Sequence, residues 1–291
     1  MRTSSVFSGT LKITLHTEDV RFNNKIKMDL QLKGKKALVT GSTGGIGFGI
    51  ALGLLREGAT VYINGRTDEK INEAITRLKT EVPDAVVEGI AADFSKVSEV
   101  NDLIKALPEI DILVNNVGVY GDQPFETTED SEWLNDFEVN VLSGVRLSRH
   151  YAPLMKAKNW GRIIFISSES AINIPEDMIL YGVTKTAYLA LSRGLAKLMK
   201  GTNVTVNAVL PGPTLAEGTE KMFDKIAAEK GISVEQAQID FIKEKRPSSV
   251  IERWATTEEV ANLVVYVASP LSSATSGAAL RVDGGVVDSA F

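Results

Sequence analysis

A tyrosine and a lysine four residues apart, Tyr181 and Lys185, begin a stretch with the apolar spacing of an amphipathic helix. Residues four apart lie on one helical face, so the phenol and the ammonium group can point into the same space. A nearby cation stabilises phenolate, which makes the phenol a better proton donor to a carbonyl oxygen at neutral pH. The pair alone is weak evidence, because an ordinary surface tyrosine and lysine also occur at this spacing.

A glycine-rich segment, TGSTGGIG at residues 40–47, lies between a short β-rich apolar run and a helical pattern. Gly41 can form the tight turn, Gly45 lets the backbone approach a pyrophosphate, and Gly47 permits close packing. The helix that follows offers its positive N-terminal end to an anion. The segment therefore predicts a phosphate cradle, and its lack of the Lys-Ser/Thr of a P-loop argues against an NTPase.

An arginine stands where a dinucleotide fold meets the adenosine ribose, about 20 residues beyond the cradle. The sequence there reads Asn64-Gly65-Arg66-Thr67, with no carboxylate to accept the ribose 2′-hydroxyl and repel a 2′-phosphate. The planar guanidinium of Arg66 suits a phosphate group. We therefore predict NADP(H) over NAD(H), and a solvated loop arginine is the alternative interpretation.

Short β-rich runs alternate with helical patterns along the chain. This alternation predicts one Rossmann-type, doubly wound parallel sheet of about seven strands with helices on both faces, because parallel crossovers are usually helical. The expected strands are 36–40, 60–64, 86–92, 111–116, 161–168, 204–210 and 278–283. The expected helices are 45–57, 68–81, 96–107, 130–157, 181–200 and 256–268.

Composition excludes several classes of function. The chain has no cysteine and only two histidines, His16 and His150, which leaves no cysteine-based metal site, thiol nucleophile or HExxH pair. A formal net charge of −5 without a dense basic block gives no electrostatic footprint for nucleic acid or a membrane surface. We expect no metal ion, a small-molecule partner, no membrane span, and a reducing compartment such as the cytoplasm.

Taken together, these residues resemble the short-chain dehydrogenase/reductase family, with 3-oxoacyl-acyl-carrier-protein reductases among the similar members. The resemblance runs from Gly34 to Gly285 and has one departure in its motifs, Val117 in place of the usual alanine. Six motifs carry it in chain order: TGSTGGIG, Asn115-Asn116-Val117-Gly118, Asn140, Ser168 thirteen residues before the tyrosine, Tyr181-x3-Lys185, and Pro211-Gly212.

The resemblance implies hydride transfer between a nicotinamide and a carbonyl or secondary alcohol. Ser168 would hold the carbonyl oxygen, Tyr181 would donate its proton, Lys185 would bind the nicotinamide ribose and lower the tyrosine pKa, and Asn140 would position a water. The implied cofactor-binding residues are Gly41, Ser42, Thr43, Gly45, Ile46, Gly47, Arg66, Asp93, Asn115, Gly118, Tyr181, Lys185, Pro211, Gly212 and Thr214.

The substrate is left open among a 3-oxoacyl thioester, a ketone and a polyol. A non-catalytic dinucleotide sensor or scaffold is the alternative function, although retention of all four catalytic side chains argues against it. The resemblance also implies a homodimer or homotetramer that pairs the helices 130–157 and 181–200.

Two segments lie outside the family pattern. Residues 1–27 are rich in Ser, Thr and basic residues, and we favour a non-native extension over an organelle transit peptide. We expect residues 28–291 to form one catalytic domain with a helical lid at about 213–253. The lid residues Met222, Phe223, Ile226, Phe241 and Ile242 could form a substrate wall or the buried face of two short helices.

Overall fold

A computed structural model describes residues 28–121 and 124–290. The expectations for residues 1–27 and for His16 lie outside the described residues. None of the described helices is long and apolar enough to cross a bilayer.

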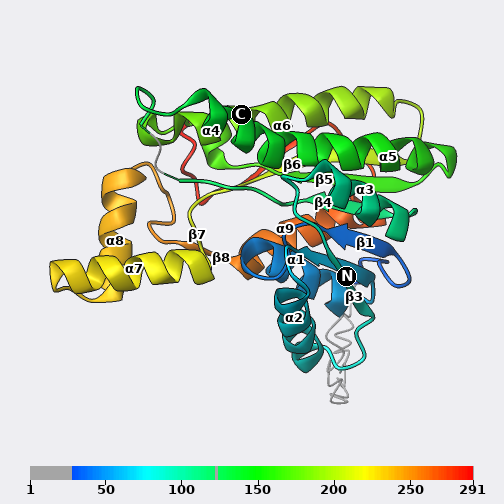
Figure 1. The fold of residues 1–291 in the computed structure, drawn as a ribbon, viewed down its shortest axis with the longest axis horizontal. Coiled ribbons are helices and arrows are strands. Elements are labelled where there is room, and N and C mark those ends of the chain that lie inside the picture. The colour runs from blue at the N-terminus through cyan, green and yellow to red at the C-terminus, as the bar shows by residue number, and fades with distance from the viewer. Residues whose placement is uncertain (1–27, 122–123, 291) are drawn as a thin grey trace, which may run out of the picture.

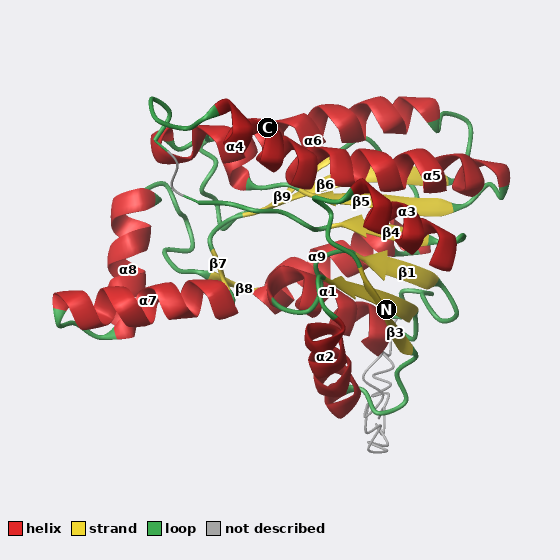
Figure 2. Ribbon diagram, viewed as in Figure 1, coloured by secondary structure: helices red, strands yellow, loops and turns green. Residues whose placement is uncertain are grey.

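Seven parallel strands form the central sheet, which confirms the predicted doubly wound architecture (Figure 2). Each strand begins and ends within one or two residues of its predicted range, because the apolar runs are clearly bounded by turn residues. Across the sheet the order is β3 (Val87–Ala91), β2 (Thr60–Gly65), β1 (Lys36–Val39), β4 (Ile112–Asn115), β5 (Gly161–Ile166), β6 (Val204–Pro211) and β9 (Ala279–Val282).

Helices cover both faces of this sheet (Figure 1). Alternate strand residues point to opposite faces, so Ala37 and Val39 join one apolar core and Leu38 joins the other. The first core is closed by α1 (Gly45–Arg56), α2 (Asp68–Glu81) and α9 (Thr257–Ala268). The second is closed by α3 (Val97–Ala106), α5 (Ser143–Ala157) and α6 (Ile179–Leu198).

The chain reverses its direction across the sheet between β1 and β4. It runs outward from β1 through β2 to β3, and then returns to place β4 beside β1. The connections that leave these two neighbouring strands therefore diverge, which opens a crevice at their carboxyl ends. The cradle loop after β1 and the loop after β4 both border this crevice.

The expected helix 130–157 is divided in the structure, and in this respect the prediction was wrong. It consists of α4 (Asp130–Phe137), a π-helical turn η1 (Glu138–Leu142), and α5. A π-helical turn inserts an extra residue into the helix, and such turns are frequent at functional sites. Asn140 lies within this turn and is fully buried.

Two helices between β6 and α9 stand apart from the rest of the protein, at the left of Figure 1. They are α7 (Glu217–Lys230) and α8 (Val234–Lys245), and they share a small core of their own formed by Phe223, Ala237, Ile242 and Trp254. A two-stranded sheet of β7 (Thr214–Leu215) and β8 (Ala255–Thr256) joins this unit to the body. We refer to residues 214–256 as the lid.

Candidate functional site

A cleft of about 900 Å³ opens at the carboxyl ends of the central strands. It brings together most of the residues that the sequence predicts for the site: Gly41, Thr43, Gly45, Ile46, Gly47, Arg66, Asp93, Gly118, Ser168, Tyr181, Lys185, Pro211, Gly212 and Thr214. Three predicted residues, Ser42, Asn115 and Asn140, do not line it.

Ser168, Tyr181 and Lys185 converge in the part of the cleft above β5. Ser168 follows β5 and caps the short 3-10 helix η2 (Glu169–Ala171), where its Oγ accepts a hydrogen bond from the Ser170 N–H at 3.1 Å. Its side chain also lies close enough to the Tyr181 phenol to lower the pKa of that phenol. Lys185 Nζ lies 5.5 Å from the centroid of the Tyr181 ring, so the predicted one-face arrangement of the two residues is present.

Burial governs the charge of this cluster. Lys185 is 4% exposed, its Nζ donates to the Ile166 carbonyl at 3.0 Å, and burial lowers its pKa to about 8. Burial raises the pKa of Tyr181 to about 12, although Ser168 acts in the opposite direction. Desolvation is thus the largest influence on the phenol, and the lowering of the tyrosine pKa by Lys185, which the resemblance implies, stays a prediction. The phenol keeps its proton at neutral pH.

Asn140 lies behind this cluster and is held by the loop after β4. Its Nδ2 donates to the Val119 carbonyl at 2.9 Å and to Thr184 Oγ1 at 3.1 Å, while its Oδ1 accepts from the Val119 N–H at 2.7 Å. Both amide protons are used, and one lone pair of Oδ1 remains. The expected bound water stays a prediction.

The glycine cradle has the backbone geometry and the space that a phosphate group requires. Gly41 and Gly45 have φ values of +60° and +58°, which side-chain-bearing residues rarely adopt. A Cβ at Gly47 would lie 2.5 Å from both the Gly41 carbonyl oxygen and Asn116 Nδ2. Gly44, the N-cap residue of α1, has no side chain to cap the first N–H groups of the helix, which leaves them for an anion, and the Glu217 carboxylate lies beside Gly44. The cradle therefore fits a dinucleotide pyrophosphate.

Asn64 fixes the cradle from the end of β2, a role that the sequence analysis missed. Its Oδ1 accepts a hydrogen bond from the Gly41 N–H at 3.0 Å, and its Nδ2 donates to the carbonyls of Ile90 at 3.0 Å and Ala92 at 3.3 Å. In the sequence, Asn64 was informative only because it is not an acid. No local pattern predicts these contacts, since they join three different strands.

In the segment Asn115-Asn116-Val117-Gly118, Asn116 and not the expected Asn115 lies at the cleft. Asn115, the last residue of β4, is 1% exposed and does not line the cleft, whereas Asn116 does. Asn116 Nδ2 donates to the Gly41 carbonyl at 3.0 Å and thereby ties the β4 loop to the cradle. A direct cofactor contact by Asn115 stays a prediction.

Arg66 and Asp93 occupy the outer end of the cleft. Arg66 is exposed at the end of β2. Asp93 Oδ1 accepts hydrogen bonds from the backbone N–H and hydroxyl of Ser95 at 3.0 and 2.8 Å, and these bonds lower the pKa of its carboxyl group. An ionised Asp93 and the exposed Arg66 guanidinium, whose charge also lowers the pKa of Asp93, are thus available to an adenosine moiety.

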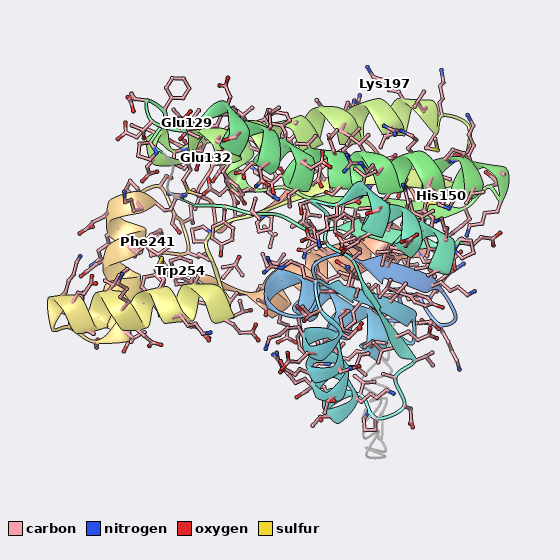
Figure 3. The ribbon with its side chains drawn as sticks, viewed as in Figure 1. Glu129, Glu132, His150, Lys197, Phe241 and Trp254 are labelled. Carbon is pink, nitrogen blue, oxygen red and sulfur yellow. The ribbon has the colours of Figure 1, made fainter. Side chains whose placement is uncertain are left out.

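Some apolar residues of the lid form a wall of the cleft, and others form the buried face of its two helices. Met222 and Phe241 line the cleft with Trp254, whereas Phe223 and Ile242 are buried inside the lid. Phe241 and Trp254 are labelled in Figure 3, where they lie on the lid side of the molecule. On the opposite side, the ring of Tyr120 packs edge-on against Tyr181 with their centroids 6.1 Å apart, a contact that the sequence analysis also missed.

His150 and the acidic side chains of the segment Glu129–Glu138 do not line the cleft, although Asn135 of that segment does; Glu129, Glu132 and His150 are labelled in Figure 3. The Glu129 N–H donates to Glu132 Oε2 at 3.0 Å, in the first turn of α4. His150 Nε2 lies 3.1 Å from the Pro108 carbonyl oxygen. No group of three or more histidine or acidic side chains within residues 28–121 and 124–290 is placed to hold a metal ion.

Comparison with known proteins shows which family this chain resembles. The family model described as Enoyl-(Acyl carrier protein) reductase matches residues 41–287. The "Uncharacterized oxidoreductase YvaG" of Bacillus subtilis is 50% identical over 91% of this chain and 100% of its own length. The D-beta-hydroxybutyrate dehydrogenase of Cupriavidus necator is 34% identical over 88% of this chain and 99% of its own.

The chain belongs to the short-chain dehydrogenase/reductase family. The crystal structure of L-sorbose reductase from Gluconobacter frateurii, complexed with NADPH and L-sorbose, is 30% identical with a TM-score of 0.84, and covers 90% of this chain and 100% of that one. As a short-chain dehydrogenase/reductase, the protein is an NAD(P)-dependent oxidoreductase that acts on CH–OH groups.

The cradle makes a prediction about dinucleotide binding. Gly47→Ala should weaken NADPH binding at least about tenfold, because the added methyl group displaces the cradle backbone. Gly194→Ala is the matched control, since a Cβ there meets nothing within 4 Å. Fluorescence titration of NADPH measures both variants, with thermal unfolding to show that each is folded. Equal NADPH affinity in wild type and Gly47→Ala would contradict the assigned cradle.

Proposed function

We propose that this protein uses NADP(H) to reduce a ketone or aldehyde to an alcohol, or to catalyse the reverse oxidation. The observation that carries the proposal is the convergence of Ser168, Tyr181 and Lys185 in the same cleft as an open glycine cradle. When bound, the nicotinamide supplies or accepts the hydride, and the protein supplies orientation and the proton.

Each of the three side chains has a role in proton delivery. The hydroxyl of Ser168 hydrogen-bonds the substrate oxygen and holds it beside the phenol. Tyr181, which keeps its proton at neutral pH because burial raises its pKa, donates that proton as the alcohol forms. Lys185 binds the nicotinamide ribose hydroxyls, and Asn140, which lies next to it across Gly118, positions a water that links Lys185 to solvent.

The preference for NADP(H) rests on the end of β2. The residue at this position is Asn64, which has no carboxylate to offer the ribose, and its side chain is buried and hydrogen-bonded to the cradle. Arg66 is exposed beside it. A guanidinium there binds a 2′-phosphate through charge-assisted hydrogen bonds. The NADPH complex of the similar L-sorbose reductase supports this choice.

The substrate belongs to one of three classes: ketones, polyols or 3-oxoacyl thioesters. L-Sorbose reductase and D-beta-hydroxybutyrate dehydrogenase among the similar proteins support a small hydroxylated or keto substrate. We further propose a cytoplasmic homodimer or homotetramer. Leucines exposed on α4, α5 and α6 support pairing through these helices: Leu134, Leu154 and Leu198.

The assigned proton donor predicts the effect of removing one oxygen atom. Tyr181→Phe should lower kcat/KM for a carbonyl substrate by about 10²–10⁴-fold, because the general acid is lost while the ring stays in place. NADPH affinity, measured by fluorescence titration, should change little. Turnover retained by Tyr181→Phe would refute the assignment.

The assigned 2′-phosphate contact predicts a selective change in cofactor affinity. Arg66→Ala should weaken NADPH binding by about tenfold or more and leave NADH binding unchanged, since only NADPH carries the phosphate. Isothermal titration of both cofactors measures this, with Arg149→Ala, an exposed arginine on α5, as the control. Undiminished NADPH binding by Arg66→Ala would remove the basis for NADP(H) preference.

A further inference from the structure

Two ion pairs connect the end of α8 to the segment between β5 and α6. Lys245 Nζ lies 2.9 Å from Asp177 Oδ2 at the surface, where an ion pair contributes about 0–1 kcal/mol. Arg246 Nε lies 2.7 Å from Glu169 Oε1, and these two side chains are only 11% and 3% exposed. The inner pair is thus buried, and Glu169 directly follows Ser168.

The ion pair of Glu169 with Arg246 leaves part of its hydrogen-bonding capacity unused. Arginine usually binds a carboxylate through two parallel N–H···O bonds, but here only Nε reaches Glu169, and Nη1 donates to the Lys245 carbonyl at 2.8 Å. Glu169 Oε1 also accepts from Ser170 Oγ at 3.2 Å, whereas Oε2 is buried without a hydrogen-bond partner. Arg246 Nη2 forms no hydrogen bond within the described residues. One donor and one acceptor are therefore left unmatched in the same pair.

This unmatched pair borders the reacting group. Glu169 and Arg246 both line the cleft, and both act on the pKa of Tyr181, the carboxylate raising it and the guanidinium lowering it. The other side chains of this wall are the apolar Met178, Met222 and Phe241, Trp254, whose Nε1 donates to the Gln238 carbonyl, and the outer ion pair of Asp177 with Lys245. Glu169 and Arg246 are therefore the charged pair of this wall that acts on Tyr181 and has a donor and an acceptor to offer a ligand.

The chemistry of the pair favours one kind of ligand group. A hydroxyl can accept a hydrogen bond from Nη2 and donate one to a Glu169 oxygen, so it satisfies both atoms at once. A carboxylate only accepts and would be repelled by Glu169, and an alkyl group does neither. Oε2 is shielded from solvent in this form, but rotation about the terminal torsion of glutamate is soft and exchanges its two oxygens.

We propose that Glu169 and Arg246 form a hydroxyl-binding subsite, which selects substrates that carry a hydroxyl group close to the reacting carbonyl or carbinol carbon. The inference rests on the proposed function and chooses among its substrate classes. Hydroxy ketones and polyols are the substrates that this subsite fits, in preference to plain ketones and oxo acids.

The test compares carbonyl compounds that differ in one group, with the full chain and NADPH. Hydroxyacetone and methoxyacetone have similar electron withdrawal, but only hydroxyacetone can donate to Glu169; acetone and pyruvate complete the series. The wild type should reduce hydroxyacetone with a kcat/KM at least about tenfold above that for each of the others. Equal kcat/KM for hydroxyacetone and methoxyacetone would overturn the subsite without any variant.

Paired variants locate the preference. Glu169→Leu with Arg246→Met removes the acceptor, the donor and both charges together and leaves no charge buried alone, and it should reduce the hydroxyl preference to about twofold or less. Asp177→Asn with Lys245→Gln, which removes only the outer ion pair, should keep the wild-type preference. A preference that survives in the inner double variant would contradict the proposal.

A binding measurement separates the subsite from the proposed reaction. Ligand-observed NMR with the NADP⁺-saturated protein should show hydroxyacetone bound at least about fivefold more tightly by the wild type than by the inner double variant. If no carbonyl compound oxidises NADPH, the proposed reaction fails and this binding difference alone decides the subsite. Equal binding by the two proteins would overturn it.

Discussion

The burial of the Lys185 ammonium group beside the Tyr181 phenol is the constraint on which the site depends. A buried ammonium requires a fixed acceptor, and the carbonyl of Ile166 at the end of β5 provides it. The hydrogen bond between Lys185 and Ile166 fixes α6 against the sheet and places Tyr181 next to Ser168. Gly118 completes the arrangement, because a Cβ there would lie 3.2 Å from Lys185 Nζ. Sheet, helix and loop thus meet at one charged atom.

The cleft separates its tasks among different parts of the fold. Backbone at the carboxyl ends of the strands forms the cradle, and the side-chain amides of Asn64 and Asn116 hold it in shape through hydrogen bonds to Gly41. The lid has its own apolar core and reaches the catalytic turn through the Glu169–Arg246 pair. Hydride and proton chemistry can therefore be kept constant while lid residues change the choice of substrate.

The sequence predicts those features that depend on local periodicity or fixed spacing. The seven strands and the convergence of Ser168, Tyr181 and Lys185 follow from apolar runs and from offsets along the chain. Long-range contacts carry no such signal, which is why the contacts of Asn64 with the cradle and the pairing of Glu169 with Arg246 were missed. The π-helical turn at Asn140 was missed too, because it extends a helical pattern without interrupting it. The raised pKa of Tyr181 depends on burial, which spacing does not reveal.

The ionisation of Tyr181 tests the central claim most directly. The ultraviolet absorbance of tyrosinate is recorded against pH for the cofactor-free wild type and Tyr181→Phe, and their difference reports this one phenol. The account predicts no tyrosinate signal from Tyr181 near the ordinary pKa of about 10, and its appearance only as the pH approaches about 12. A difference signal that titrates at or below pH 10 in the folded protein would contradict a phenol held protonated by burial.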